Sequence, residues 1–332
     1  MSTIRLCIRF SCSLALYLLS SVATADTVVM TWNAGSVLST ADVPPRAGAF
    51  QALADQQRPD VLLLQEVTSV AVVAAIRETM GLAGHHMAVS DFVQDDNAGY
   101  GALEVAILSR FPLTEVREFD PFPDQTGDPG EPAERVLVPP ALPGLNVTHT
   151  ARGFLVARIG ALDLSVAVTH LKSSRGDTGT GDAGNASKRE TTAAALALWV
   201  ADELQARPGT TVLVGGDFNV GERDTARNGV DLQVDCFEGA ACGALDRYDE
   251  THALLGEGLV DGLTMTSLSR EIDRTYANWD YGTGPIDVLY VVGDGAGRFE
   301  AAQRGESDYG SDHFPVWTVI PALIFRGGFE SD

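Results

Sequence analysis

Polar side chains that could bind a phosphate group or a metal ion follow several apolar, strand-like runs of this chain. The stretch TVLVGGDFN at 211–219 places Asp217 and Asn219 two residues apart, after a predicted buried strand and two glycines. Asp and Asn are common in turns because their side chains hydrogen-bond nearby backbone groups, so a plain turn explains the pair taken alone. Alternatively, the strand is a rigid support that presents both side chains to a pocket at its carboxyl end.

Similar residues stand at the ends of other predicted strands. Besides Asp217 and Asn219, they are Asn33, Glu66, His170, Asp287, Asp312 and His313. One such residue is unremarkable, but several that converge from the ends of packed strands have the chemistry of a metal-assisted hydrolase.

The elements that must position these residues alternate along the chain. Strands are predicted at 27–33, 61–67, 103–110, 151–159, 164–171, 211–219, 285–292 and 314–320, and helices at 44–60, 70–81 and 188–206. Residues 119–150 are rich in Pro, Gly and acids and are expected to form a long surface excursion, while the Gly/Asp/Ser-rich residues 173–187 are expected to be a mobile loop. No linker divides two cores, so we expect one α/β domain over 26–320 and a tail at 321–332 outside it.

The order of the motifs resembles a known superfamily. TWN, LLLQE, VTHLKS, GGDFN, PIDVLYV and SDHFPV, spread over about residues 27–320, are similar to the motifs of endonuclease/exonuclease/phosphatase enzymes of the deoxyribonuclease I type. The resemblance implies a four-layer α/β/β/α sandwich, in which two packed mixed sheets lie between helices. It also implies a metal-dependent hydrolase of phosphoesters.

Three residues match the superfamily's metal site. Glu66 resembles its metal-binding glutamate, Asn33 the partner near the metal and the phosphate, and Asp312 a carboxylate at the edge of the metal. A hard divalent ion that keeps several waters and takes one or two carboxylates is Mg²⁺, with Mn²⁺ as the usual substitute. The expected cofactor is therefore Mg²⁺.

Five residues match the superfamily's catalytic groups. Asp217 and Asn219 resemble the pair that orients the attacking water and contacts the phosphate. His313 with Asp287 resembles a His–Asp pair that holds one imidazole tautomer. His170 resembles a second active-site histidine, which donates to a phosphate oxygen or to the leaving group.

Substrate contacts are expected from three further residues. Arg152 falls where the deoxyribonuclease I branch has an arginine that contacts phosphate. Lys172 lies two residues after His170, near enough to meet an approaching phosphate. Tyr100, in DNAGYGA, either contacts the substrate or belongs to a turn.

The first 25 residues have the features of a secretory signal peptide. Arg5 and Arg9 precede the apolar run LALYLLSSV, and the small residues ATA at 23–25 suit cleavage after Ala25. The 307 residues that follow contain 21 basic and 45 acidic side chains, a net charge of −24. This charge repels phosphate polymers at long range, so a polyanionic substrate needs bound cations and a few local basic groups. The protein is expected to be secreted or periplasmic, without stable membrane insertion.

Only Cys236 and Cys242 remain after cleavage of the expected signal peptide. In an oxidising compartment, two cysteines six positions apart most simply form a local disulfide. Two free or metal-bound thiols are the alternative.

The expected function is a secreted, metal-dependent nuclease that cleaves DNA, with no protein partner implied. The superfamily's fold also supports other substrates, so a secreted phosphodiesterase or phosphatase for a small or lipid phosphoester is the alternative. A non-catalytic binding module would require a lost catalytic residue, and none of the principal ones is missing.

Overall fold

The computed structural model describes residues 25–92, 104–120, 134–135, 152–173, 183–222, 249–278 and 282–322. Tyr100, Cys236 and Cys242 and almost all of the predicted signal peptide lie outside these residues, so the expectations for them stay predictions. Among the described helices, none combines the length and the apolar character that crossing a membrane requires.

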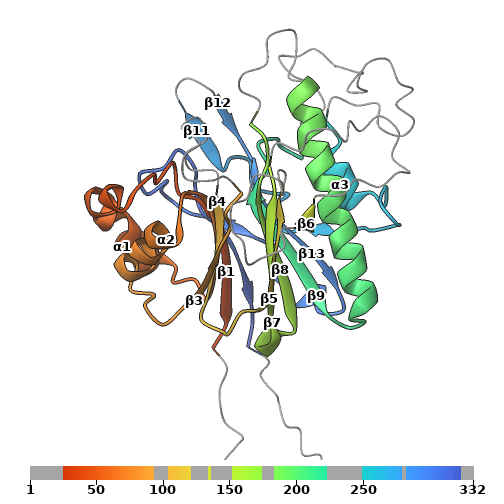
Figure 1. Cartoon of the computed structure of the whole chain (residues 1–332), viewed down its shortest axis with the longest axis horizontal. Helices are drawn as coiled ribbons and strands as arrows, with labels where there is room; N and C mark the ends of the chain where they lie inside the picture. Colours follow the sequence, from red (N-terminus) through yellow and green to blue (C-terminus); the bar gives the residue numbers. More distant parts are fainter. Residues whose placement is uncertain are drawn as a thin grey trace, which may run out of the picture.

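Two large sheets form the centre of the fold (Figure 1). The first sheet has the order β14-β15-β1-β2-β4-β3, with bounds β1 Thr27–Asn33, β2 Val61–Val67, β3 His86–Val89, β4 Glu104–Ser109, β14 Gln303–Arg304 and β15 Val316–Ile320. The second has the order β10-β13-β9-β8-β7-β5-β6, with bounds β5 Thr114–Asp120, β6 Glu134–Arg135, β7 Phe154–Ile159, β8 Leu164–His170, β9 Thr211–Asp217, β10 Thr266–Ser267 and β13 Asp287–Gly293. A separate pair is formed by β11 Tyr276–Asn278 and β12 Gly282–Gly284.

Helices cover the outer face of each sheet, which gives the four layers expected from the sequence. Helices α1 (Ala47–Gln56) and α2 (Val70–Thr79) lie on the first sheet, and α3 (Ala183–Ala206) and α4 (Thr251–Gly256) on the second (Figure 1). Short 3₁₀ turns occupy Thr40–Asp42, Pro44–Arg46, Gly160–Leu162 and Ala296–Arg298. The predicted α/β/β/α sandwich is confirmed.

Alternating side chains of single strands build different layers of the core. In β2, Leu62 and Leu64 pack with the helices on the outer face, whereas Leu63 packs between the sheets. In β9, Leu213 lies between the sheets, and Val212 and Val214 lie under α3. This two-residue period is that of a strand buried on both faces, so continuous apolar runs were a correct signal for these strands.

Two predictions about helices are corrected by the structure. The expected mobile loop 173–187 is wrong at its end, because α3 already begins at Ala183 and buries Asn185 and Ala186. Tertiary packing of this first turn outweighs the low helix propensity of Gly and Asn. The helix expected within 44–60 is a 3₁₀ turn at 44–46 followed by α1, which ends at Gln56.

Several short elements gave no clear signal in the sequence. They are β3, β5, β6, β10, β11, β12, β14 and α4. Most of these strands lie at sheet edges or in the separate pair, where a few residues suffice and one face is not deeply buried. The surface excursion expected to start at 119 begins too early, because β5 continues to Asp120.

Candidate active site

The polar residues predicted at strand ends come together at one end of both sheets. Parallel pairing of β1 with β2 places Asn33 beside Gln65, next to Glu66, and parallel pairing of β8 with β9 places His170 opposite Asp217. Strand β13 runs antiparallel to β9, so its first residue, Asp287, is also opposite Asp217. The strand register therefore places five predicted site residues at or next to the ends of adjacent strands.

The segment that carries Asp312 and His313 is attached to β1. The indole Nε1 of Trp32 donates to the carbonyl of His313 at 3.1 Å, and Ser311 Oγ donates to the carbonyl of Asn33 at 2.9 Å. Trp32 is fully buried. These two bonds hold a loop from the end of the chain against the first strand.

The turn after β9 uses special backbone conformations. Gly216 has φ +155°, and a Cβ there would lie 1.9 Å from the carbonyl oxygen of Thr169, so the close approach of β8 requires glycine. Asn219 has φ +57°, and its backbone N–H donates to Oδ1 of Asp217 at 2.8 Å. The plain turn is therefore real, while Oδ2 of Asp217 is left to face the site.

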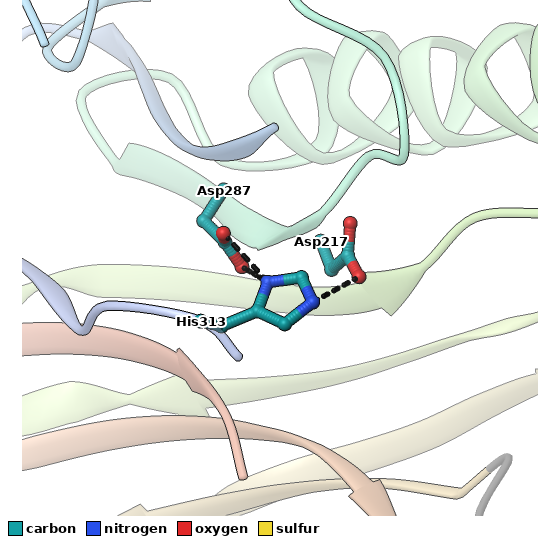
Figure 2. Close-up of side chains that lie close together, drawn as sticks. All are labelled: Asp217, Asp287 and His313. Atoms are coloured by element: carbon teal, nitrogen blue, oxygen red, sulfur yellow. Dashed lines mark hydrogen bonds and ion pairs between the residues drawn. The ribbon is translucent and has the colours of Figure 1, made fainter. Parts of the chain in front are cut away.

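His313 and Asp287 form a buried pair beside Asp217 (Figure 2). Nδ1 of His313 lies 2.8 and 3.1 Å from the two carboxylate oxygens of Asp287, and Nε2 lies 3.6 Å from Oδ2 of Asp217. Because Nδ1 carries the proton that Asp287 accepts, Nε2 is the nitrogen presented to Asp217.

The carboxylates shift the pKa values of this cluster. Burial by itself lowers the pKa of His313, but Asp287, Asp217 and Asp312 outweigh burial and raise it to about 10. Burial raises the pKa of Asp217 to about 7, against the nearby charge of His313 and a hydrogen bond from Asn33. A carboxyl group with a pKa near neutrality is suited to accept a proton at physiological pH.

His170 lies on the other side of the same Asp217 oxygen. Its Nε2 is 3.5 Å from Oδ2 of Asp217, and its Nδ1 is 3.1 Å from Nη1 of Arg152. A guanidinium only donates, so Nδ1 must accept and the ring proton is on Nε2. Burial, then the positive charges of Arg152, His313 and Lys172, hold the pKa of His170 well below its usual range. His170 is thus a neutral hydrogen-bond donor.

Glu66 has a strained backbone conformation, and both oxygens of its carboxylate accept hydrogen bonds. It has φ +58° at a β-bulge between Gln65 and Val67, in a region that non-glycine residues rarely occupy. Oε1 accepts from Asn33 Nδ2 at 3.1 Å, and Oε2 accepts from the backbone N–H and the hydroxyl of Ser36, both at 2.7 Å. Strain of this kind is frequent where a side chain must be aimed at a ligand.

Asn33 connects the metal-site candidate Glu66 with Asp217. Its Nδ2 lies 3.0 Å from Oδ2 of Asp217, while its Oδ1 accepts from the backbone N–H of Gly35 at 3.0 Å. In this orientation the Nδ2 group donates to the carboxylates of Glu66 and Asp217 and fixes their relative position, while the amide oxygen is directed at the backbone of Gly35. The prediction that Asn33 helps to bind the metal therefore stays a prediction.

The donor set fits a hard divalent cation. Glu66 and Asp312 offer carboxylate oxygens, and the side chain of Asp312 is 32% exposed, so it is accessible from solution. Asp217, Asp287 and His313 also offer ligand atoms within 4.8 Å of one another. Both oxygens of Asp287 already face Nδ1 of His313, so a cation bound by this group would have to replace that hydrogen bond.

Two further predicted residues, Asn219 and Lys172, make hydrogen bonds to backbone carbonyls near the site. Nδ2 of Asn219 donates to the carbonyl of Leu171 at 2.9 Å, which ties the turn after β9 to the end of β8. Nζ of Lys172 lies 3.0 Å from the carbonyl of Ser173. Both residues are thus close to the site along the chain, but these amide and ammonium groups already make local hydrogen bonds.

Three residues of the site were missed in the sequence. Ser36 binds Glu66, Asn278 Nδ2 donates to Oδ2 of Asp312 at 2.7 Å, and the ring of Tyr276 lies 4.8 Å from that of His313. Tyr276 and Asn278 belong to β11, a strand of three residues without an apolar run to reveal it. No local signal could have paired them with residues more than 30 positions away.

Comparison with known proteins identifies the family. The Endonuclease/Exonuclease/phosphatase family profile matches residues 30–313, which include all the strand-end residues described above. The chain belongs to this family. It is therefore a hydrolytic phosphoesterase, and enzymes of this family depend on a divalent metal ion. No curated protein matches the sequence.

Solved structures share the fold at low sequence identity. A 3'-5' exonuclease (NExo) from Neisseria meningitidis superimposes with a TM-score of 0.54 and 19% identity, over 89% of this chain and all of that chain. The human Nocturnin catalytic domain gives a TM-score of 0.53 and 13% identity, over 89% and 93% of the two chains. A humanized D. rerio TDP2 gives 0.51 and 15%, over 89% and 98%.

Proposed function

We propose that this enzyme is a secreted, Mg²⁺-dependent nuclease that hydrolyses phosphodiester bonds of DNA. The observation that carries the proposal is the buried His313–Asp287 pair beside Asp217, joined through Asn33 to Glu66. A neighbouring structure supports the substrate class, since the Neisseria NExo structure of the same fold is described as bound to a product DNA hairpin. Residues 1–25, with the features of a signal peptide, support export.

The site's own residues provide the proton transfers and the phosphate contacts. As a water oxygen bonds to phosphorus, Asp217 accepts its proton, and the bond from phosphorus to the leaving oxygen breaks. Nε2–H of His170 donates to a phosphate oxygen, Nδ2 of Asn33 holds the carboxylates of Asp217 and Glu66 in place, and the imidazolium of His313 protonates the leaving oxygen. Asp287 keeps the His313 ring in one orientation throughout.

A metal ion held by Glu66 and Asp312 would act as a Lewis acid on the phosphate. Its oxygen-only donors suit Mg²⁺, with Mn²⁺ able to replace it. The net charge of −22 adds a physical reason for a cation, because the acidic surface repels a polyanion unless positive charge is bound locally.

The test compares substrates directly. The purified protein lacking residues 1–25 is incubated with plasmid DNA, RNA, sphingomyelin and inositol phosphates, each with and without chelator. We expect metal-dependent cleavage of DNA. Hydrolysis of only a small or lipid phosphoester, with DNA and RNA intact in Mg²⁺, Mn²⁺ and Ca²⁺, would replace the nuclease by a small-phosphoester hydrolase.

A further inference from the structure

Two arginines stack on a single phenylalanine next to the catalytic histidine. The guanidinium carbon of Arg304 lies 4.6 Å from the centroid of the Phe314 ring, and that of Arg274 lies 5.4 Å from it. Nη1 of Arg304 donates to the backbone carbonyl of Arg274 at 3.3 Å. We call these three residues the Phe314 patch. Arg274 is exposed, and Arg304 and Phe314 are half-buried.

The two charges of the Phe314 patch are not neutralised within the described part of the chain. No carboxylate oxygen there lies within 4.0 Å of either guanidinium, although Asp273 and Glu306 are their neighbours in sequence. Six other described arginines do form such ion pairs: Arg77, Arg110, Arg158, Arg189, Arg207 and Arg270. The Phe314 patch therefore brings two guanidinium groups together without an ion pair to a described carboxylate, on a chain with a net charge of −22.

The strand register places the Phe314 patch at the active-site end of the first sheet. Arg304 pairs with Val316, and Val316 pairs with Thr31, two residues before Asn33. Phe314 follows His313 directly, and its N–H donates to the carbonyl of Thr275 at 2.7 Å. The next residue, Tyr276, contacts the ring of His313. The patch therefore adjoins the site along the segments that carry Phe314 and Arg274.

We propose that the Phe314 patch binds a backbone phosphate of the DNA strand that runs out of the active site. This inference rests on the proposed nuclease function and names one of its substrate contacts. A guanidinium stacked on a ring keeps its edge N–H groups available, and their planar fork matches two phosphate oxygens. Stacking also restricts the side chain before the substrate arrives, which lowers the entropy cost of the contact. The contact is independent of base sequence.

The experiment measures kcat and KM for a linear DNA duplex at several NaCl concentrations. The variants are Arg274→Ala, Arg304→Ala and the double variant, with Arg274→Lys and Arg304→Lys to keep the charge. Arg110→Ala is the matched control, because Arg110 also stacks on a phenylalanine but pairs with Asp60 at the opposite end of β2. Circular dichroism and Tm verify that each variant folds.

Each alanine variant is expected to raise KM about two- to fivefold with little change in kcat, as for a partly exposed ion pair. The dependence of log(kcat/KM) on log[NaCl] should become shallower by about 0.9 for each lost phosphate contact, while the lysine variants and Arg110→Ala keep the wild-type slope. A folded double variant with the wild-type KM and salt slope would show that the Phe314 patch binds no phosphate, and would leave the proposed nuclease function standing. A wild-type protein that hydrolyses a small phosphoester but no nucleic acid refutes the proposed nuclease function, and the patch with it.

Discussion

Nη1 of Arg152 lies 3.1 Å from Nδ1 of His170, and this contact determines the state of the histidine. Since the guanidinium can only donate, His170 is neutral and its proton is on Nε2, on the side of Asp217. A histidine paired with a carboxylate would instead be driven towards the imidazolium form, as His313 is by Asp287. Burial and the partners of the two histidines thus make His170 neutral and His313 positively charged.

Replacing Arg152 by alanine should allow the His170 ring to adopt either neutral tautomer. The lost hydrogen bond involves a charged donor, so we expect the cleavage rate to fall about tenfold or more. ¹⁵N NMR shifts of the His170 ring should change from a single Nε2–H tautomer to a mixture. Arg158→Ala is the control, because Arg158 lies in β7, the strand that follows Arg152, but pairs with Asp163 away from the site. An unchanged tautomer in Arg152→Ala would contradict the assignment.

Replacing Asp287 by asparagine should impair the proton transfer assigned to His313. An amide can hold the ring in the wrong tautomer and cannot stabilise the imidazolium, and positioned proton transfer contributes roughly 10²–10⁴ in rate. We expect a loss of at least about 10² in kcat, measured on plasmid DNA, with an unchanged circular dichroism spectrum. Asp294→Asn, just beyond the other end of β13, should have no such effect. A folded Asp287→Asn enzyme within about tenfold of wild type would mean that the pair is not catalytic.

Replacing Glu66 by glutamine should weaken metal binding. Ser36 and Asn33 donate hydrogen bonds to the Glu66 carboxylate. Glutamine keeps the shape of this side chain but removes its negative charge. The Mg²⁺ concentration for half-maximal activity should rise at least about tenfold, and chelator should abolish activity of the wild type. Glu78→Gln, at an exposed surface pair with Arg77, is the matched control. Full wild-type activity in excess chelator would be incompatible with the mechanism.

The buried neutral His170 should make a contribution to stability that is lost in mild acid. Its pKa in the folded protein is well below the ordinary value of about 6.5 that it regains on unfolding. Below about pH 6.5 the unfolded chain therefore binds a proton that the folded protein does not, and stability falls by up to about 1.4 kcal/mol per pH unit until the folded pKa is reached. His85, whose pKa burial also lowers, adds to this slope. Asp217 opposes it, because burial raises its pKa to about 7 and the folded protein then binds a proton there that the unfolded chain does not.

Urea unfolding between pH 7 and pH 5, in the presence of chelator, measures this effect. His170→Gln removes the titrating group, so between pH 7 and pH 5 the variant should gain stability relative to the wild type as the pH is lowered. Identical slopes for the two proteins would show that folding does not lower the pKa of His170.

The sequence by itself determined which residues stand at the ends of which strands. Runs such as VLLLQEV and TVLVGGDFN are apolar because both faces of the strand are buried, and the polar residue that ends each run marks the edge of the sheet. These signals are local in the chain. They located Glu66 and Asp217, and together with the order of the motifs they predicted the four-layer fold.

Only the tertiary structure decided which side chain meets which. Arg152 and His170, Asn278 and Asp312, and Asn33 and Asp217 are 18, 34 and 184 positions apart, and each pair is joined by a single hydrogen bond. Such a bond leaves no periodic pattern in either segment, since it depends on sheet order and register, which bring distant segments to within about 3 Å. The charge states of the two histidines follow from those partners, so they too became visible only once the chain was folded.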